Sequence, residues 1–299
     1  MSNVLVAALY KFVPMPARET LAPQLRERCT ELGIFGTLLL ASEGINGTIA
    51  GTPQNVQVFL SELCAQPGLG DLEPKYSTVA EQPFRRMKVH LKDEIVTMGV
   101  PGVDPTQRVG TYLNPEQWNE LLRSGDVVVL DTRNDYEVQM GTFQDAVNPG
   151  TTTFREFPAF VRANLDPSKN KKVAMFCTGG IRCEKASAFM LSEGYEEVFH
   201  LQGGILKYLE TTPKEQSLWQ GDCFVFDRRV AVDHELAPGE HTICDQCQRP
   251  LSAADRDSSK FEQDVSCPHC FDCLSEADIH TLRARALILR PVPETLRAR

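Results

Sequence analysis

A cysteine and an arginine that could do chemistry together lie in the glycine-rich stretch 177–183, whose sequence is CTGGIRC. The apolar run 172–176 before it predicts a buried strand, and apolar residues at helical spacing from Ala186 onward predict a helix. Cys177 then lies where a strand ends, facing loop N–H groups, the positive end of a helix dipole and Arg182. Each of these favours the thiolate over the thiol. The stretch therefore predicts a nucleophilic thiolate at the mouth of an anion-binding loop.

The predicted loop surrounds Cys177 with backbone N–H groups and one guanidinium. Its residues are Thr178, Gly179, Gly180, Ile181 and Arg182. We expect Arg182 to lower the Cys177 pKa and to hold an anionic group. Cys183 is either a resolving thiol or a small buried side chain at the start of the helix, which is the commoner role of a free cysteine. The alternative interpretation of the whole stretch is a buried cysteine in a glycine-rich turn.

A second group of cysteines lies near the C-terminus. It consists of two C-x-x-C units with nineteen residues between them, formed by Cys244, Cys247, Cys267 and Cys270. This spacing is typical of a tetrahedral zinc site, and four thiolates would close the site and make its role structural. Further candidate ligands nearby are His241, His269 and Cys273. The alternative is a reduced cluster without metal.

Composition limits the class of protein and its partners. The 299 residues contain ten cysteines, 31 basic and 40 acidic residues, and the net charge is −9. Thiolate and metal chemistry account for the cysteines better than a disulfide framework does, and the start of the chain does not resemble a secretory signal. We therefore expect a cytoplasmic protein. The negative charge argues against indiscriminate nucleic-acid binding, although basic clusters at 85–88, 169–172 and 228–229 and the C-terminal arginines could form local patches.

The N-terminal region, 1–98, predicts a ferredoxin-like domain. Apolar runs predict strands over 4–12, 37–41 and 48–50, with helices over 17–32 and from Pro53. Two late strands over 89–91 and 94–96 complete the order βαββαβ. The turn 43–47 is either a ligand contact or, more simply, a hairpin built on Asn46-Gly47. Two prolines and two glycines within 99–108 indicate a linker over 99–110.

The rest of the chain predicts two further regions. Strand and helix patterns alternate from Thr111, which indicates a parallel α/β domain over 123–217 with a lead-in helix. The Cys177 loop lies at the carboxyl end of one of its strands, where such sheets place their sites. A Cys-rich region over 218–299 closes the chain, with a helix over 276–289. The predicted fold class is therefore α/β multidomain.

Three motifs in the middle region resemble those of a rhodanese domain. They are Asp131-Thr132-Arg133 with Glu137, the stretch 177–182, and the sequence LQGGI at 201–205. The resemblance implies that Cys177 carries a persulfide. Asp131, Arg133 and Glu137 are expected to order the fold, because buried charges persist by pairing.

The whole arrangement is similar to the bacterial tRNA uridine hydroxylase family. The similarity adds residues 43–47 (EGING), residues 84–89 (FRRMKV) and the Cys-rich C-terminus to the central motifs. It implies oxygen-dependent conversion of the wobble uridine, in the tRNA anticodon loop, to 5-hydroxyuridine, with Cys177 as the catalytic residue and molecular oxygen as co-substrate. The sequence shows no flavin, nicotinamide or haem signature.

Three other functions are alternatives for a chain with these residues. A sulfurtransferase would pass persulfide sulfur from Cys177 to an acceptor. A cysteine phosphatase fits less well, because four residues rather than five separate Cys177 from Arg182. A non-catalytic adaptor has no need of either residue. For base stacking the candidate platforms are Phe154, Phe157 and Tyr208, each with core packing as its alternative.

Overall fold

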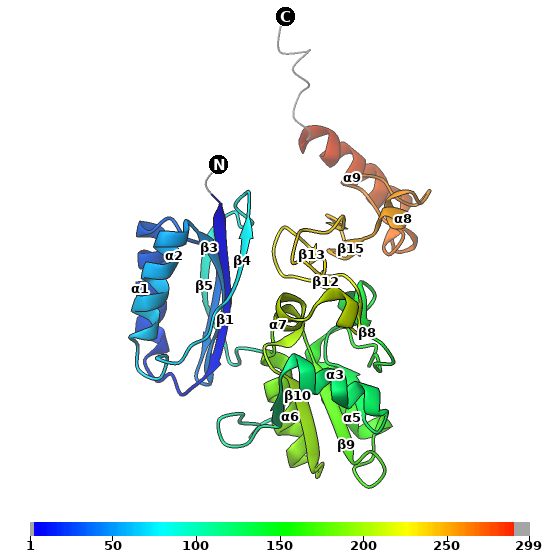
Figure 1. Ribbon diagram of the computed structural model, residues 1–299. Coiled ribbons are helices and arrows are strands. Elements are labelled where there is room, and N and C mark those ends of the chain that lie inside the picture. Colours follow the sequence, from blue (N-terminus) through cyan, green and yellow to red (C-terminus); the bar gives the residue numbers. More distant parts are fainter. Residues whose placement is uncertain (1–2, 290–299) are drawn as a thin grey trace, which may run out of the picture. The chain divides into compact units, whose positions relative to one another are not determined.

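A five-stranded sheet forms the N-terminal part of the protein in a computed structural model, which describes residues 3–289 (Figure 1). The strands are β1 (Val4–Phe12), β2 (Phe35–Ala41), β3 (Gly44–Gly51), β4 (Lys75–Val79) and β5 (Met87–Leu91). Their order is β4-β1-β3-β2-β5, and only the pairing of β2 with β5 is parallel among those described. The first four strands in this order make the ferredoxin-like sheet, and β5 extends it by one edge strand.

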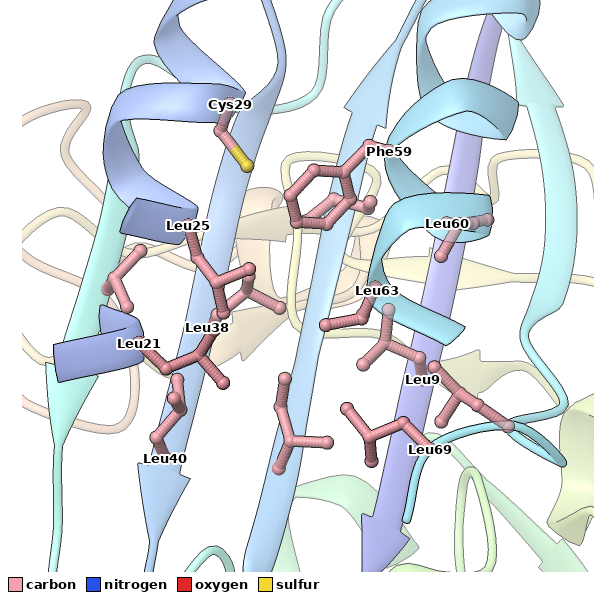
Figure 2. Packing of buried hydrophobic residues seen from close by; sticks show 14 of the residues in the cluster. Leu9, Leu21, Leu25, Cys29, Leu38, Leu40, Phe59, Leu60, Leu63 and Leu69 are labelled. Atoms are coloured by element: carbon pink, nitrogen blue, oxygen red, sulfur yellow. The ribbon is translucent and has the colours of Figure 1, made fainter. Parts of the chain in front are cut away.

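Helices α1 (Arg18–Glu31) and α2 (Pro53–Cys64) pack against this sheet. Figure 2 shows Leu25 of α1 next to Leu38 of β2, and Phe59 of α2 over the middle of the sheet; all three side chains are buried. Thr52 caps α2 by accepting a hydrogen bond from the Asn55 backbone N–H at 3.3 Å. The apolar spacing and the cap residue therefore place both helices where the sequence predicts them.

Two local predictions for this region are wrong, and one strand was not predicted. The hairpin turns at Ser42-Glu43, so Asn46 and Gly47 lie inside β3, paired with Leu39 and Leu38. Gly47 is needed there because a Cβ would lie 2.1 Å from the Thr37 carbonyl oxygen. Residues 94–96 form a loop rather than a strand, because Glu94 turns back to accept hydrogen bonds from backbone N–H groups just after it. The edge strand β4 is polar and exposed on alternate residues, and the apolar pattern gave no sign of it.

A four-stranded sheet lies at the centre of the next region, and its order is β6-β10-β9-β7. All its pairings are parallel, as predicted. The strands are β6 (Thr111–Leu113), β7 (Val128–Asp131), β9 (Lys172–Phe176) and β10 (Glu197–Leu201). The helices are α3 (Pro115–Ser124), α4 (Asp135–Val138), α5 (Phe157–Asn164), α6 (Ile181–Ser192) and α7 (Gly204–Thr211). Short strands β8 (Gly141–Phe143) and β11 (Trp219–Gly221) pair antiparallel beside it.

Aromatic side chains fill the core on one face of this sheet. Phe143 contacts Phe176, Trp118, Tyr208 and Trp219 edge to face, with ring centroids 4.8–5.5 Å apart. Edge-to-face geometry of this kind adds to the burial of apolar area. Since Phe176 is the last residue of β9, this packing fixes the point from which the Cys177 loop departs.

The chain divides into two compact units, Met1–Arg228 with Val232–Ala237 and Arg229–Ala231 with Pro238–Arg299. The first unit also contains β12 (Cys223–Phe224), and β13 (Ala231–Val232) lies at the division. The second contains β14 (Thr242–Ile243), β15 (Pro250–Leu251), α8 (Ala253–Arg256) and α9 (Glu276–Leu289). The domain limits read from the sequence stay predictions, and the arginines at 290, 297 and 299 lie outside the described residues. Among the helices described, none is both long and apolar enough to cross a membrane.

Candidate active site

The Cys177 loop is held at the end of β9 by backbone hydrogen bonds. The carbonyl oxygens of Cys177 and Thr178 accept hydrogen bonds from the N–H groups of Ile205 and Leu206, at 3.0 and 3.1 Å. Gly180 has φ +102°, a conformation that favours glycine, and a Cβ there would lie 2.8 Å from the Tyr10 hydroxyl. The loop therefore curls tightly into α6, as predicted.

The Cys177 sulfur lies inside this curl and is fully buried. It accepts a hydrogen bond from the Gly180 N–H at 3.1 Å. Burial alone would raise the pKa of Cys177, but hydrogen bonds from the Cys183 thiol, the charge of Arg182 and the N–H groups of Cys183 and Gly180 outweigh it. The Cys177 pKa falls to about 5, so the side chain is a thiolate at neutral pH.

Arg182 is held beside the loop by a buried carboxylate. Its two terminal nitrogens donate to the two carboxylate oxygens of Glu137, at 2.7 and 2.8 Å. Both side chains are buried, which leaves the guanidinium fixed in direction. A second buried pair, Arg133 with Asp131 at 2.6 Å, lies in the same region. Arg182 thus contributes its charge to Cys177 from a fixed position, and its expected role of holding an anionic group stays a prediction.

Cys183 is buried at the first turn of α6 and contacts the loop rather than solvent. Its sulfur lies 3.5 Å from the Thr132 hydroxyl. Burial and the neighbouring Cys177 raise the pKa of Cys183 well above its ordinary value. Cys183 is therefore a thiol that donates a hydrogen bond toward Cys177. This arrangement agrees with the packed interpretation of Cys183 and adds a hydrogen-bonding role.

A cavity of about 1270 Å³ opens beside the loop, between the N-terminal sheet and the rhodanese-like sheet of the first unit. Tyr10 and Lys75 line it from the N-terminal sheet, and Tyr112 and Glu184 line it from the other side. The Tyr10 hydroxyl donates a hydrogen bond to Glu184 at 2.7 Å. Gly180 of the loop lies next to this contact, since a Cβ on Gly180 would lie 2.8 Å from the Tyr10 hydroxyl oxygen. The N-terminal domain therefore supplies part of the wall next to the nucleophile.

A buried lysine joins α6 to the N-terminal domain. The Lys185 ammonium donates to both carboxylate oxygens of Glu43 at 2.8 and 2.9 Å, to Glu94, and to the Val96 carbonyl at 3.1 Å. Lys185 is 1% exposed. No pattern in the sequence indicated this cluster. The predicted 43–47 turn therefore has a contact within the chain, because the Glu43 carboxylate binds Lys185 of α6, the helix that follows the active loop.

Two family descriptions match the chain. Residues 4–95 match the UPF0176 acylphosphatase like domain, and residues 114–211 match the rhodanese-like domain. The tRNA uridine(34) hydroxylase of Teredinibacter turnerae is 58% identical over 272 residues, covering 91% of this chain and 85% of that protein. The chain belongs to the tRNA uridine(34) hydroxylase family. The predicted fold class and the predicted family are both confirmed.

Solved structures resemble parts of this tRNA uridine(34) hydroxylase family member. The rhodanese-like domain of the Anabaena protein Alr3790 is 17% identical with a TM-score of 0.31, covering 37% of this chain and 78% of that one. An acylphosphatase from Coxiella burnetii is 10% identical with a TM-score of 0.24, covering 30% of this chain and 94% of that one. Both likenesses are partial.

The aromatic residues proposed from the sequence as stacking platforms are in the core of this hydroxylase-family protein. Phe154, Phe157 and Tyr208 are 7%, 1% and 0% exposed, so none offers a ring face to a base. An exposed ring near the site is that of Phe226, at 61%. It packs edge to face on Phe224 at 5.0 Å and lies 5.9 Å from the Arg182 guanidinium carbon. Phe226 was not predicted from the sequence, because it differs from the other phenylalanines in the exposure of its ring and not in its local sequence pattern.

The four C-terminal cysteines of this family member do come together. The sulfurs of Cys244, Cys247, Cys267 and Cys270 all lie within 4.8 Å of one another. Three of the separations are 3.6, 3.7 and 3.9 Å. Zn–S bonds of about 2.3 Å in a tetrahedron place sulfurs about 3.8 Å apart. The donor set and spacing therefore fit a closed Cys₄ zinc site. His269 instead lies 3.5 Å from Asp255, and Cys273 is exposed.

Proposed function

We infer that this protein hydroxylates uridine 34 of tRNA at carbon 5, giving 5-hydroxyuridine, with molecular oxygen as co-substrate. The observation that carries this function is the Cys177 sulfur, which is buried in the loop and accepts the Gly180 N–H, in a chain from the tRNA uridine(34) hydroxylase family. The loop and the charge of Arg182 lower the pKa of Cys177 to about 5, which favours the thiolate. Thiolate is the reactive form of cysteine, so the site holds a nucleophile at neutral pH without a separate base.

The sulfur nucleophile would add to the uracil ring and make its carbon 5 electron-rich. The Cys177 sulfur is fully buried, which favours a persulfide as the reacting form. A second sulfur would place the reactive atom about 2 Å beyond the buried Cys177 sulfur. A persulfide or thiosulfate-type donor would have to supply that sulfur.

Binding of the tRNA would occur through the anticodon loop. Single-stranded loop bases are recognised by stacking on aromatic rings and on Arg planes. Phe226 supports this mode, because its ring is exposed next to Arg182 in a cluster with Phe224. The reaction would take place in the cytoplasm, where tRNA is processed. We also propose that Cys244, Cys247, Cys267 and Cys270 hold a zinc ion that stabilises the second unit and takes no part in the reaction.

Sulfur transfer is the second candidate function. A low-pKa cysteine in a rhodanese-like loop can pass persulfide sulfur to an acceptor without tRNA. The two functions differ in what they consume, since only hydroxylation requires tRNA and oxygen.

Nucleoside mass spectrometry separates these functions. Cells without this protein would be complemented with the wild type, with Cys177→Ser, or with Cys64→Ser, a free cysteine of the N-terminal domain that serves as a matched control. We expect 5-hydroxyuridine derivatives to fall without the protein and to return with the wild type and Cys64→Ser only. If their level never changes, the hydroxylase function is wrong and persulfide transfer from Cys177 becomes the working function.

A further inference from the structure

One lysine on the cavity wall next to the active loop makes no ion pair with any residue that the structure describes. Three lysines line this cavity. Lys11 pairs with Asp71, and Lys207 pairs with Glu210 at 2.8 Å. Within residues 3–289, the Lys75 ammonium makes neither an ion pair nor a hydrogen bond, and its nearest recorded contact is the Tyr10 ring, 4.8 Å to the centroid. A half-buried ammonium that faces a cavity without a partner is suited to receive a negatively polarised oxygen.

A hydrogen-bond acceptor, Glu184, lines the same cavity as the Lys75 ammonium. The Glu184 carboxylate accepts a hydrogen bond from the Tyr10 hydroxyl at 2.7 Å. Because a carboxylate has about four lone-pair sites, Glu184 keeps capacity for a further donor. It is the second residue after Arg182 on α6, so it is carried by the same helix turn as the active loop. Donor and acceptor therefore line the same cavity, Lys75 from β4 of the N-terminal sheet and Glu184 from α6.

We propose that Lys75 and Glu184 line the uracil-binding site in this cavity, with Glu184 accepting the N3–H of uridine 34 and Lys75 donating to its O4. The proposal rests on the proposed function and deepens it by naming what selects the base. Uracil presents a donor at N3 between two acceptor oxygens, and this pair matches that edge. Cytosine has an acceptor at N3 and an amino group in place of O4, so it would meet a carboxylate and an ammonium with the wrong polarity.

The same lysine would stabilise the charge that forms during addition. When the sulfur at Cys177 adds to carbon 6 of uracil, one S–C6 bond forms and the C5=C6 π bond breaks. The electron pair moves onto carbon 5 and is delocalised through carbon 4 onto O4, with no proton transferred in the step. An ammonium directed at O4 binds this developing enolate more strongly than it binds the neutral base.

The electrostatic surroundings of Lys75 and Glu184 agree with this assignment. Burial lowers the pKa of Lys75, while the negative charges of Cys177 and Glu184 act against that shift. Burial raises the pKa of Glu184, and the hydrogen bonds from Tyr10 and Tyr112 act against it. Lys75, Glu184 and the nucleophile are therefore within electrostatic reach of one another.

The test compares Lys75→Gln with Lys207→Gln, which removes the same charge from the same cavity. We expect Lys75→Gln to lower kcat for uridine 34 about 100-fold with little change in KM, as loss of one oxyanion donor does. Lys75→Arg should restore part of kcat, and Lys207→Gln should change kcat less than twofold. Where turnover cannot be followed in vitro, the 5-hydroxyuridine level of complemented cells gives the same comparison.

A binding measurement tests Glu184 without any turnover. Fluorescence anisotropy would compare anticodon stem-loop RNAs that differ only in uridine or cytidine at position 34. We expect the wild type to prefer uridine and Glu184→Gln to lower that preference about tenfold. If Lys75→Gln behaves like Lys207→Gln while the wild type still makes 5-hydroxyuridine, the inference is overturned and the proposed function stands. If the wild type makes none, both are wrong.

Discussion

Both carboxylate oxygens of Glu137 bind Arg182, at 2.7 and 2.8 Å, and both side chains are buried. The guanidinium is therefore neutralised by Glu137 on one side while its positive charge still lowers the pKa of Cys177 on the other. The resulting site is a rigid electrostatic support for the thiolate, in which Arg182 has little freedom to follow a moving anion.

The first prediction concerns this pair. Arg182→Met leaves the buried Glu137 carboxylate without the guanidinium that binds both its oxygens, and should lower the free energy of unfolding by about 3–5 kcal/mol. The double variant Arg182→Met with Glu137→Met should recover most of that loss, because two apolar side chains replace two buried charges. Urea denaturation measures both. A double variant no more stable than Arg182→Met would contradict this account of the pair.

The second prediction concerns pH. The folded-state pKa of Cys177, about 5, lies below the ordinary cysteine value of about 8.5. Ionised Cys177 therefore stabilises the fold fully above about pH 8.5, and this contribution is lost as the pH falls through 5. The difference in unfolding free energy between the wild type and Cys177→Ser should grow steadily from pH 5 to pH 9.

A spectroscopic titration checks the same pKa directly. The ultraviolet thiolate absorbance of the wild type, minus that of Cys177→Ser, should have its midpoint near pH 5. Cys183→Ala should raise the midpoint, because it removes the thiol whose hydrogen bond helps to lower the Cys177 pKa. A midpoint near 8.5 in the wild type would show that the loop does not stabilise the thiolate.

Local sequence signals predicted the active loop well. Strand β9, the glycines after Cys177 and the start of α6 at Ile181 are adjacent in the chain, so propensity and spacing define all three. The partners of the loop were beyond such signals. Lys185 and its partner Glu43 are 142 residues apart, and no periodic pattern links a buried cation to a distant carboxylate. Exposure of Phe226 was equally invisible, since it depends on how segments far apart in the chain pack.

The third prediction concerns the lysine that joins α6 to the N-terminal domain. Lys185→Met leaves Glu43 and Glu94, both about a fifth exposed, without their shared cation. We expect the unfolding free energy to fall by about 3 kcal/mol, the lower limit for breaking a buried pair. The matched control is Lys172→Met, whose partner Asp126 is exposed and whose loss should cost less than about 1 kcal/mol. Equal losses in the two variants would argue against a buried role for Lys185.

The fourth prediction concerns the exposed ring beside Arg182. Phe226→Ala should weaken binding of an anticodon stem-loop RNA by about 1–3 kcal/mol, the usual contribution of one stacked base. Phe226→Trp should bind as well as the wild type, because it keeps an aromatic face. Fluorescence anisotropy at fixed salt measures all three proteins. The Cys177 titration should be unchanged in both variants. If Phe226→Ala binds the RNA as tightly as the wild type, Phe226 does not contact the RNA.

The last prediction concerns the four C-terminal cysteines. If their sulfurs hold zinc, elemental analysis of the purified protein should find one zinc ion per chain, and Cys267→Ser should reduce that content. Zinc supplies folding free energy in small domains with little core, and the buried cluster here consists mainly of the cysteines themselves with Leu251. Chelation should therefore expose the second unit to proteolysis, with cleavage after residue 238 and not within the first unit.

The matched control for this site is Cys273→Ser. Cys273 is exposed and is not one of the four clustered thiols, so its replacement should leave both zinc content and protease resistance unchanged. A structural role also requires that the Cys177 titration survive chelation, because the thiolate is stabilised by groups of the first unit. A protein that lacks zinc and still resists proteolysis after chelation would show that the thiol cluster packs without metal.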